Sequence, residues 1–240
     1  SCLFTIKGKD AGIKYEYWCE ATVKAKEEAG SAFATTTSNR ITVQYTSYKD
    51  IIALKGAGSE EDPYKISSID DLKQIKTLVE NGYSLQGLHF ALQNDIELPS
   101  DWKPIGCLKK ESSKEDPEEQ GKNVYPFSGI FDGKDASNKV HKVTVAKDCK
   151  SLFNYVRDAE IRNLEIYGEQ IDGYGLVDKY FVDYGTDGKY GTGCPQAVTI
   201  ENVVLKKGSK VLKSGFIGGY ASGANTVYIT NCTVEPDVEI

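Results

Sequence analysis

Two scarcities limit the chemistry open to this chain of 240 residues. It contains no methionine and only two histidines, His89 and His141. These two histidines form neither the two-histidine helix motif of zinc peptidases nor a Ser/His/Asp grouping that the sequence would support. We expect each histidine to lie at the surface or in a groove. The lack of methionine indicates that the chain begins partway into a longer product.

Long apolar runs and concentrated positive charge are also missing. No run of apolar residues approaches the roughly 20 that cross a bilayer as a helix, and no signal peptide opens the chain. We therefore expect this segment not to span a membrane. The net charge of -6, without a concentrated basic patch, argues against a nucleic-acid partner.

Cysteine spacing and proline content narrow the class of protein further. The 6 cysteines include no CxxC pair, so neither a zinc knuckle nor a redox motif is supported. We predict no metal and no cofactor, and disulfides are permitted without being required. Only 7 prolines accompany 23 glycines and 15 tyrosines, which is typical of a β-rich chain with many tight corners.

A short phrase recurs in the second half of the chain. Its copies read isoleucine, any residue, asparagine, apolar, any residue, apolar, so the last two apolar residues share one face of a strand. The copies are IRNLEI (Ile161 to Ile166), IENVVL (Ile200 to Leu205) and ITNCTV (Ile229 to Val234). VHKVTV, from Val140 to Val145, is interpreted as a degenerate copy with Lys142 at the asparagine position. Self-similarity at such intervals predicts stacked repeats.

Residues 1 to 44 form a separate, alternating segment. The phrase KDAGIKYEYWCEATV, Lys9 to Val23, resembles the late strands of a bacterial immunoglobulin-like domain, in which a tyrosine precedes the cysteine by two residues, as Tyr17 precedes Cys19. We predict a partial immunoglobulin-like domain here, with an edge hairpin packed on the following residues as the alternative. Residues 45 to 62 read as a linker, which places a domain boundary near residue 55.

A single helix is predicted from about residue 68 to 81. Ser68 is a suitable N-cap, Asp70 and Asp71 occupy the first turn, and Gly82 ends the helix. Apolar residues at helical spacing form one stripe: Ile69, Leu72, Ile75, Leu78 and Val79. One buried stripe suits a helix that caps the end of stacked strands.

The motif order after residue 56 resembles the GLUG-repeat proteins of bacterial cell surfaces. The matching series is GAGSEEDPYKISS, the helix, HFALQNDIEL, WKPIG, FSGIFDGK and VHKVTV. The glycine-leucine phrase of that family is matched by SLFNYV at Ser151, GLVDKY at Gly175 and GFIGGY at Gly215. The resemblance implies an all-β fold: a right-handed parallel β-helix over residues 63 to 240, with coils from 88 to 240 and one N-terminal capping helix. A partial immunoglobulin-like β-sandwich would precede it.

Stacked repeats would place equivalent side chains in ladders. We predict an asparagine ladder of Asn163, Asn202 and Asn231, with solvated turn residues as the alternative reading. Cys232 occupies an apolar slot of the third copy and is predicted to be a buried free thiol.

The widest interval between copies contains an insertion, residues 181 to 196, which is the best candidate for ligand binding. Aromatic faces and carboxylates in and beside it could contact a sugar: Tyr180, Asp183, Tyr184, Asp187 and Tyr190. The acids lack the regular spacing of a calcium loop, so no metal is predicted. The alternative is a surface loop pinned by its aromatic residues.

These features favour a non-catalytic extracellular module, because the outward positions of the repeats form a mixed polar face without a carboxylate cluster. The module would be adhesive or structural, would lie on the bacterial cell surface or be secreted, and would bind a host or microbial glycan or a surface protein. The alternative is a carbohydrate-active β-helix enzyme or the repeat region of a secreted peptidase, such as the IgA-cleaving metallopeptidases. The chain stops just past a repeat strand without a closing cap, so end-to-end self-association is a third expectation.

Overall fold

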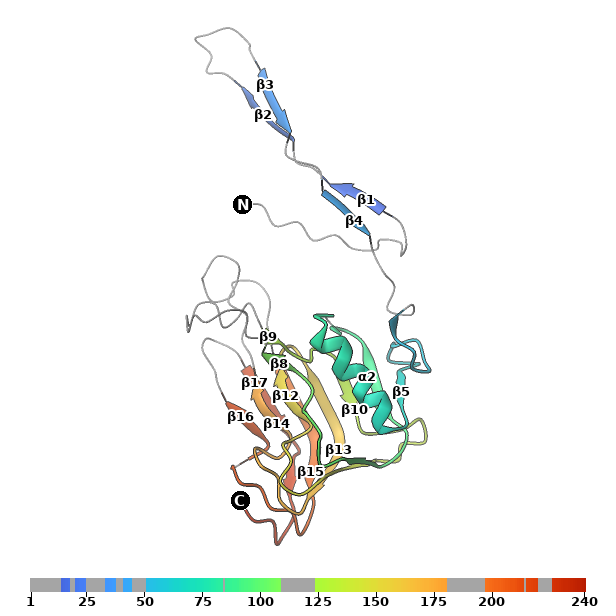
Figure 1. Cartoon of the computed structure of the whole chain (residues 1–240), viewed down its shortest axis with the longest axis vertical. Helices are drawn as coiled ribbons and strands as arrows, with labels where there is room; N and C mark the ends of the chain where they lie inside the picture. The colour runs from blue at the N-terminus through green and yellow to red at the C-terminus, as the bar shows by residue number, and fades with distance from the viewer. Residues whose placement is uncertain are drawn as a thin grey trace. The chain divides into compact units, whose positions relative to one another are not determined.

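The chain consists of two compact units, Ser1–Ala53 and Leu54–Ile240 (Figure 1). The computed structural model describes residues 14–17, 20–24, 33–37, 41–44, 51–83, 85–108, 124–180, 197–213, 215–219 and 226–240.

The first unit contains two separate two-stranded sheets. β1 (Lys14–Tyr17) pairs antiparallel with β4 (Ile41–Gln44), and β2 (Glu20–Lys24) pairs antiparallel with β3 (Phe33–Thr37). The predicted partial immunoglobulin-like β-sandwich is wrong for these strands. A sandwich is built from multi-stranded sheets packed face to face, whereas each described strand here has a single partner and forms a narrow ribbon.

The second unit is mostly β and is built around a nine-stranded sheet whose named pairs are all parallel. Its main path runs in the order β17-β15-β13-β10-β6-β5, and three short strands pair alongside it. The strands are β5 (Tyr64–Ile66), β6 (His89–Leu92), β7 (Ile96–Leu98), β10 (Ile130–Asp132), β11 (Lys142–Val145), β13 (Glu160–Gly168), β15 (Ala197–Leu205), β17 (Thr226–Thr230) and β18 (Thr233–Val234).

Two smaller sheets complete the second unit. β12 (Phe153–Val156), β14 (Val177–Tyr180) and β16 (Ile217–Gly219) form a three-stranded parallel sheet. β8 (Cys107–Leu108) and β9 (Val124–Tyr125) form an antiparallel pair.

The prediction of a right-handed parallel β-helix is wrong. In a closed solenoid each repeat supplies a strand to every face, but the described residues form open parallel sheets and no closed solenoid. β5, β6 and β7 belong to the nine-stranded sheet alone. Where the chain passes the three-stranded sheet before β12, Ile105 and Phe127 make only isolated bridges to it. Pro104 and Pro126 stand beside these bridges, and proline has no N–H with which to extend a ladder.

The one described α-helix, α2 (Ile69–Glu80), confirms the predicted helix. Ser68 is its N-cap and forms a capping box with Asp71, whose side chain accepts from the Ser68 backbone N–H. The predicted stripe is buried at Leu72, Ile75, Leu78 and Val79. At 12 residues α2 is too short to cross a bilayer, and no other helix in the described part of the chain could do so.

Aligned side chains fill the core of the second unit. One row of residues in register crosses the nine-stranded sheet from edge to edge: Tyr64, Phe90, Phe131, Ile161, Ile200 and Ile229. At its aromatic end the rings of Tyr64 and Phe90 lie 5.6 Å apart. Phe127 lies between the two parallel sheets, with its ring 6.0 Å from Phe90 of β6 and 5.0 Å from Phe153 of β12. These contacts join the sheets into one core.

Candidate functional site

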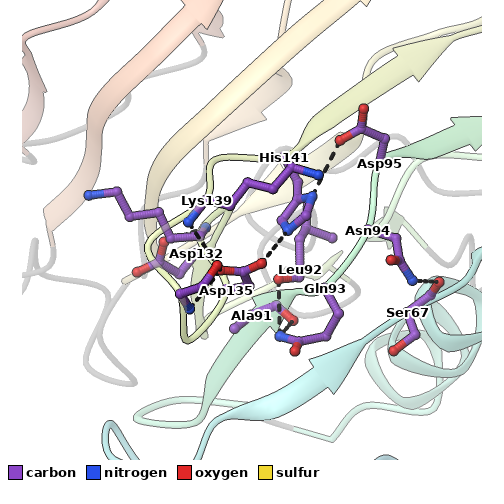
Figure 2. Close-up of polar contacts among 12 residues, drawn as sticks. Ser67, Ala91, Leu92, Gln93, Asn94, Asp95, Asp132, Asp135, Lys139 and His141 are labelled. Atoms are coloured by element: carbon purple, nitrogen blue, oxygen red, sulfur yellow. Dashed lines mark hydrogen bonds and ion pairs between the residues drawn. The ribbon is translucent and has the colours of Figure 1, made fainter.

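A buried histidine of the second unit, His141, lies just before β11 and is flanked by two carboxylates (Figure 2). His141 is 1% exposed, so the prediction of a surface or groove residue is wrong. Its Nε2 lies 3.0 Å from Asp135 Oδ2, and its Nδ1 lies 3.3 Å from Asp95 Oδ1. Each ring nitrogen thus lies within hydrogen-bond distance of a different carboxylate.

Each carboxylate is positioned by backbone donors. Asp135 Oδ1 accepts from the Ser137 N–H at 2.8 Å, the Ser137 hydroxyl at 2.6 Å and the Lys139 N–H at 3.0 Å. The bond from Ser137, together with that from His141, holds the pKa of Asp135 well below its usual range. Asp95 Oδ1 accepts from the Lys142 N–H at 3.1 Å, and this bond lowers the pKa of Asp95. Both groups are therefore anions at neutral pH.

The cluster ties together turns that are far apart in the sequence. Asp95 lies in the turn between β6 and β7, and Asp135 lies in the turn after β10. The neighbouring Asn94 side chain donates to Ser67 O at 3.0 Å, which links the same turn to the residue before the α2 cap (Figure 2). Because both ring nitrogens of His141 are engaged, this geometry fastens the turns and leaves neither nitrogen free for proton transfer.

The asparagine positions share one backbone conformation. Asn163, Asn202 and Asn231 have φ values of 53°, 54° and 52°, in the left-handed region that asparagine tolerates. Asn202 Nδ2 donates to Asn163 Oδ1 at 3.1 Å, and Asn163 Nδ2 donates to Asp132 Oδ1 at 2.9 Å. Within the described residues no such bond joins Asn231 to Asn202.

The sequence did not predict that Asp132 continues this row of hydrogen-bonded side chains, because VHKVTV is interpreted there as the fourth copy of the phrase. That alignment is wrong: Lys142 lies in register with Glu165, and Asp132 lies in register with Arg162. β13 is long enough to pair with β10 and β11 in succession. The repeat therefore begins at Phe131, nine residues before VHKVTV. Phe131 at the isoleucine position of the phrase was the available signal.

Charged side chains also pair within strands and between them. Arg162 Nε lies 2.7 Å from Asp132 Oδ2, and its Nη1 lies 2.6 Å from Glu160 Oε1. Lys206 lies between Glu235 and Glu165, at 2.7 and 3.2 Å. The hydrogen bond to Glu235 raises the pKa of Lys206, and Glu165 adds to the effect. Like the contacts of His141, these pairs join side chains from separate segments of the chain.

The predicted ligand-binding residues are not placed by the structure. Asp183, Tyr184, Asp187 and Tyr190 lie outside the described residues. Tyr180 is the last residue of β14, and its side chain also lies outside the described part.

Asp178, two residues before Tyr180, is a buried carboxylate that sequence reasoning missed. It is 7% exposed, and its Oδ1 has no hydrogen-bond partner among the described residues. Lys150 Nζ is 4.0 Å from its other oxygen. The available signal was a charged residue directly after two apolar residues, Leu176 and Val177, and two positions from Leu176, so that it shares a buried face of the strand.

Three free cysteines lie in the described part: Cys107, Cys149 and Cys232. Cys232 is only partly buried, so its prediction as a buried thiol is wrong; its neighbours Ile229 and Val234 are exposed as well. Partial burial still raises the pKa of its thiol. In the described residues no group of three or more His, Cys, Asp or Glu side chains is arranged to hold a metal ion.

No protein-family model matches the chain, and no curated protein matches it. A solved structure described as a "putative immunoglobulin A1 protease" from Bacteroides ovatus is similar with a TM-score of 0.41 and 15% sequence identity. The similarity covers 75% of this chain and 49% of that one, so the matched region is about half the length of that protein. A likeness of this size carries no argument about function.

Proposed function

We propose that the chain is a non-catalytic module of the bacterial cell surface or of a secreted protein, with an adhesive or structural role. The observation that carries the proposal is that the polar side chains of its sheets and turns engage one another, within strands and between them. His141 is held by two carboxylates, Arg162 by two and Lys206 by two. Groups engaged on both sides stiffen a scaffold and are poorly placed to accept or release a proton.

The kind of partner that we propose is inferred from the sequence. Tyr180, Tyr184 and Tyr190, with Asp183 and Asp187, offer the aromatic and carboxylate groups that sugars bind. The partner would then be a host or microbial glycan, or a surface protein that carries one. The motif order, which resembles that of GLUG-repeat surface proteins, supports the extracellular location.

The catalytic alternative is tested by product release. The purified chain is incubated with a panel of polysaccharides and unfolded protein substrates, and reducing ends, unsaturated sugars and new amino termini are measured over time. We expect no release above the rate of a heat-denatured sample. Sustained release that scales with protein concentration would overturn the proposal.

The binding role is tested on a glycan array. We expect selective binding that is lost in the double variant Tyr184→Ala/Tyr190→Ala and kept in Tyr83→Ala. Tyr83 is an exposed tyrosine elsewhere in the second unit and serves as the matched control. Binding unchanged by the double variant would remove these residues from the site, and no binding to any glycan would leave the structural role.

A further inference from the structure

Asp178 of β14 departs from the pattern of engaged polar side chains. It is buried, and its Oδ1 has no hydrogen-bond partner among the described residues. Lys150 Nζ lies 4.0 Å from Oδ2, which is beyond hydrogen-bond distance, and the Lys150 side chain is 54% exposed. A buried carboxylate oxygen that accepts no hydrogen bond is costly, so we expect a donor from outside the described residues to complete it.

A second polar side chain without a partner lies beside Asp178. β12 and β14 pair with Phe153 opposite Val177 and Tyr155 opposite Lys179, so Asn154 stands opposite Asp178. Opposite residues of paired strands project from the same face of the sheet. The Asn154 side chain is only partly buried, and its amide makes no hydrogen bond within the described part of the chain. A carboxylate acceptor thus lies next to an amide that can both donate and accept.

Two glycines allow close approaches around the Asp178 carboxylate. A Cβ at Gly173 would lie 2.8 Å from Asp178 Oδ1, and a Cβ at Gly218 of β16 would lie 2.1 Å from the ring of Tyr174. The Tyr174 ring therefore lies against β16, the strand next to Asp178. Lys213 Nζ is 5.6 Å from the centroid of that ring, and the Lys213 N–H donates to Gly173 O at 3.0 Å. An aromatic ring and a second ammonium group thus lie beside the carboxylate.

These open groups match the chemistry of a sugar. Neighbouring hydroxyl groups of a saccharide each donate and accept, as a carboxylate beside an amide requires. Because only 8% of the Asp178 side chain is exposed, only a group as small as a hydroxyl can reach the carboxylate. Ligand sites combine a few placed polar groups with aromatic and apolar walls, and Tyr174 supplies such a wall here.

We propose that Asp178 and Asn154 bind neighbouring hydroxyl groups of a saccharide on the outer face of the three-stranded sheet. Asp178 accepts from one hydroxyl, Asn154 bonds to the next, and the half-exposed Lys150 ammonium donates to a further sugar oxygen. The inference rests on the glycan-binding role proposed above and names a site for it within the described residues. β14 leads directly from Asp178 to Tyr180, the first tyrosine assigned to that role.

A metal ion fits this site less well. Lys150 places a positive charge 4.0 Å from the carboxylate, and a cation bound there would be repelled by it. Within the described ranges no group of three or more His, Cys, Asp or Glu side chains gathers at Asp178 or elsewhere. A neutral donor such as a sugar hydroxyl has neither difficulty.

The test measures the affinity of the whole chain for the strongest binder of a glycan array by isothermal titration calorimetry. Asp178→Asn keeps the shape of the side chain, removes the charged acceptor and should weaken binding at least about ten-fold. Asp172→Asn makes the same change at an exposed aspartate in the preceding turn and should alter the affinity less than about two-fold. Asn154→Ala should also weaken binding. Full affinity in either site variant would overturn this site and leave the glycan-binding role in place, whereas no binding to any glycan would overturn both.

Melting temperatures distinguish a ligand-binding Asp178 from a structural one. Without ligand, Asp178→Asn should melt at the temperature of the unaltered chain or above it, because it removes a buried charge that has no partner. Saturating glycan should raise the melting temperature of the unaltered chain more than that of the variant. A fall of more than about 4 °C in the unliganded variant would show that Asp178 stabilises the fold by itself, and would overturn the proposal.

Discussion

At the scale of single residues, His141 contacts two carboxylates that lie far apart in the sequence. Asp95 precedes it by 46 residues and Asp135 by 6, and each contacts a different ring nitrogen. A buried hydrogen-bonding group is costly to leave without partners, so the loss of one member affects the other two. The cluster should therefore contribute to stability and have no part in turnover.

Replacing His141 tests this role. His141→Leu removes both ring nitrogens and leaves two carboxylates facing an apolar side chain, and we expect the free energy of unfolding to fall by about 2–4 kcal/mol. Urea denaturation followed by circular dichroism measures the change. His89→Leu is the matched control, because His89 is only partly buried, and a loss below about 1 kcal/mol is expected. Equal losses at the two sites would contradict the structural role.

The same carboxylates make stability depend on pH. The folded pKa values of Asp95 and Asp135 lie below the ordinary aspartate value of 3.8, so in acid the unfolded chain binds more protons than the folded one. Their contribution is complete above about pH 3.8 and is lost as the pH falls through the folded values. Melting temperatures measured between pH 6 and pH 2 should decline below pH 4. Asp135→Asn should flatten that decline, and an unaltered slope would contradict this assignment.

At the scale of elements, the parallel strands are joined by side chains as well as by backbone ladders. Asn163 lies in the middle of such a contact: it donates to Asp132 of β10 and accepts from Asn202 of β15. Its φ of 53° also requires a residue that tolerates the left-handed region. The left-handed backbone conformation and the two side-chain hydrogen bonds thus both depend on the residue at position 163.

Two substitutions separate these contributions at Asn163. Asn163→Gly keeps the backbone conformation but removes both side-chain hydrogen bonds, and should cost about 1–2 kcal/mol of unfolding free energy. Asn163→Ala adds backbone strain and should cost about 1 kcal/mol more. Asn231→Gly is the control, since Asn231 has the same φ without the bond to Asn202. Chemical denaturation that finds Asn163→Gly as harmless as Asn231→Gly would show that the side-chain row is not stabilising.

At the scale of the whole second unit, stability depends on how the two parallel sheets meet. Phe127 is 0% exposed and its ring contacts those of Phe90, Phe131 and Phe153, which come from both sheets. Phe127 therefore connects the two sheets within the core, although it belongs to no named strand. Truncation here should loosen the unit as a whole.

Phe127→Ala should lower the free energy of unfolding by about 3–5 kcal/mol, because it removes a buried ring and leaves a cavity between the sheets. Phe127→Leu fills part of that cavity and should cost about half as much. Urea denaturation of both variants is compared with that of Tyr83→Ala, which removes an aromatic ring that is 41% exposed and should cost less than about 1 kcal/mol. Similar losses for Phe127→Ala and Tyr83→Ala would contradict a shared core.

Local sequence patterns predicted the features that depend on a few adjacent residues. Ser68, the acidic first turn and the spaced apolar residues were enough to predict α2, because capping and helical periodicity act within one or two turns. The alternation in IRNLEI and IENVVL likewise predicted which side chains are buried: Leu164, Ile166, Val203 and Leu205. Asparagine at the same place in three copies marked a repeated left-handed corner.

Contacts between distant segments were decided by the tertiary structure. Whether the strands close into a solenoid depends on pairing at positions such as Ile105 and Phe127, which no strand alternation or motif order specifies. The burial of His141 depends on two turns that bring Asp95 and Asp135 to it, and Asp132 joins Asn163 only because β10 and β11 share β13 as a partner. By itself the sequence determined the helix and the alternating strands, since the energies that select them are local. Sheet closure, register and the charge pairs required the folded chain, since their partners are brought together only when the whole unit packs.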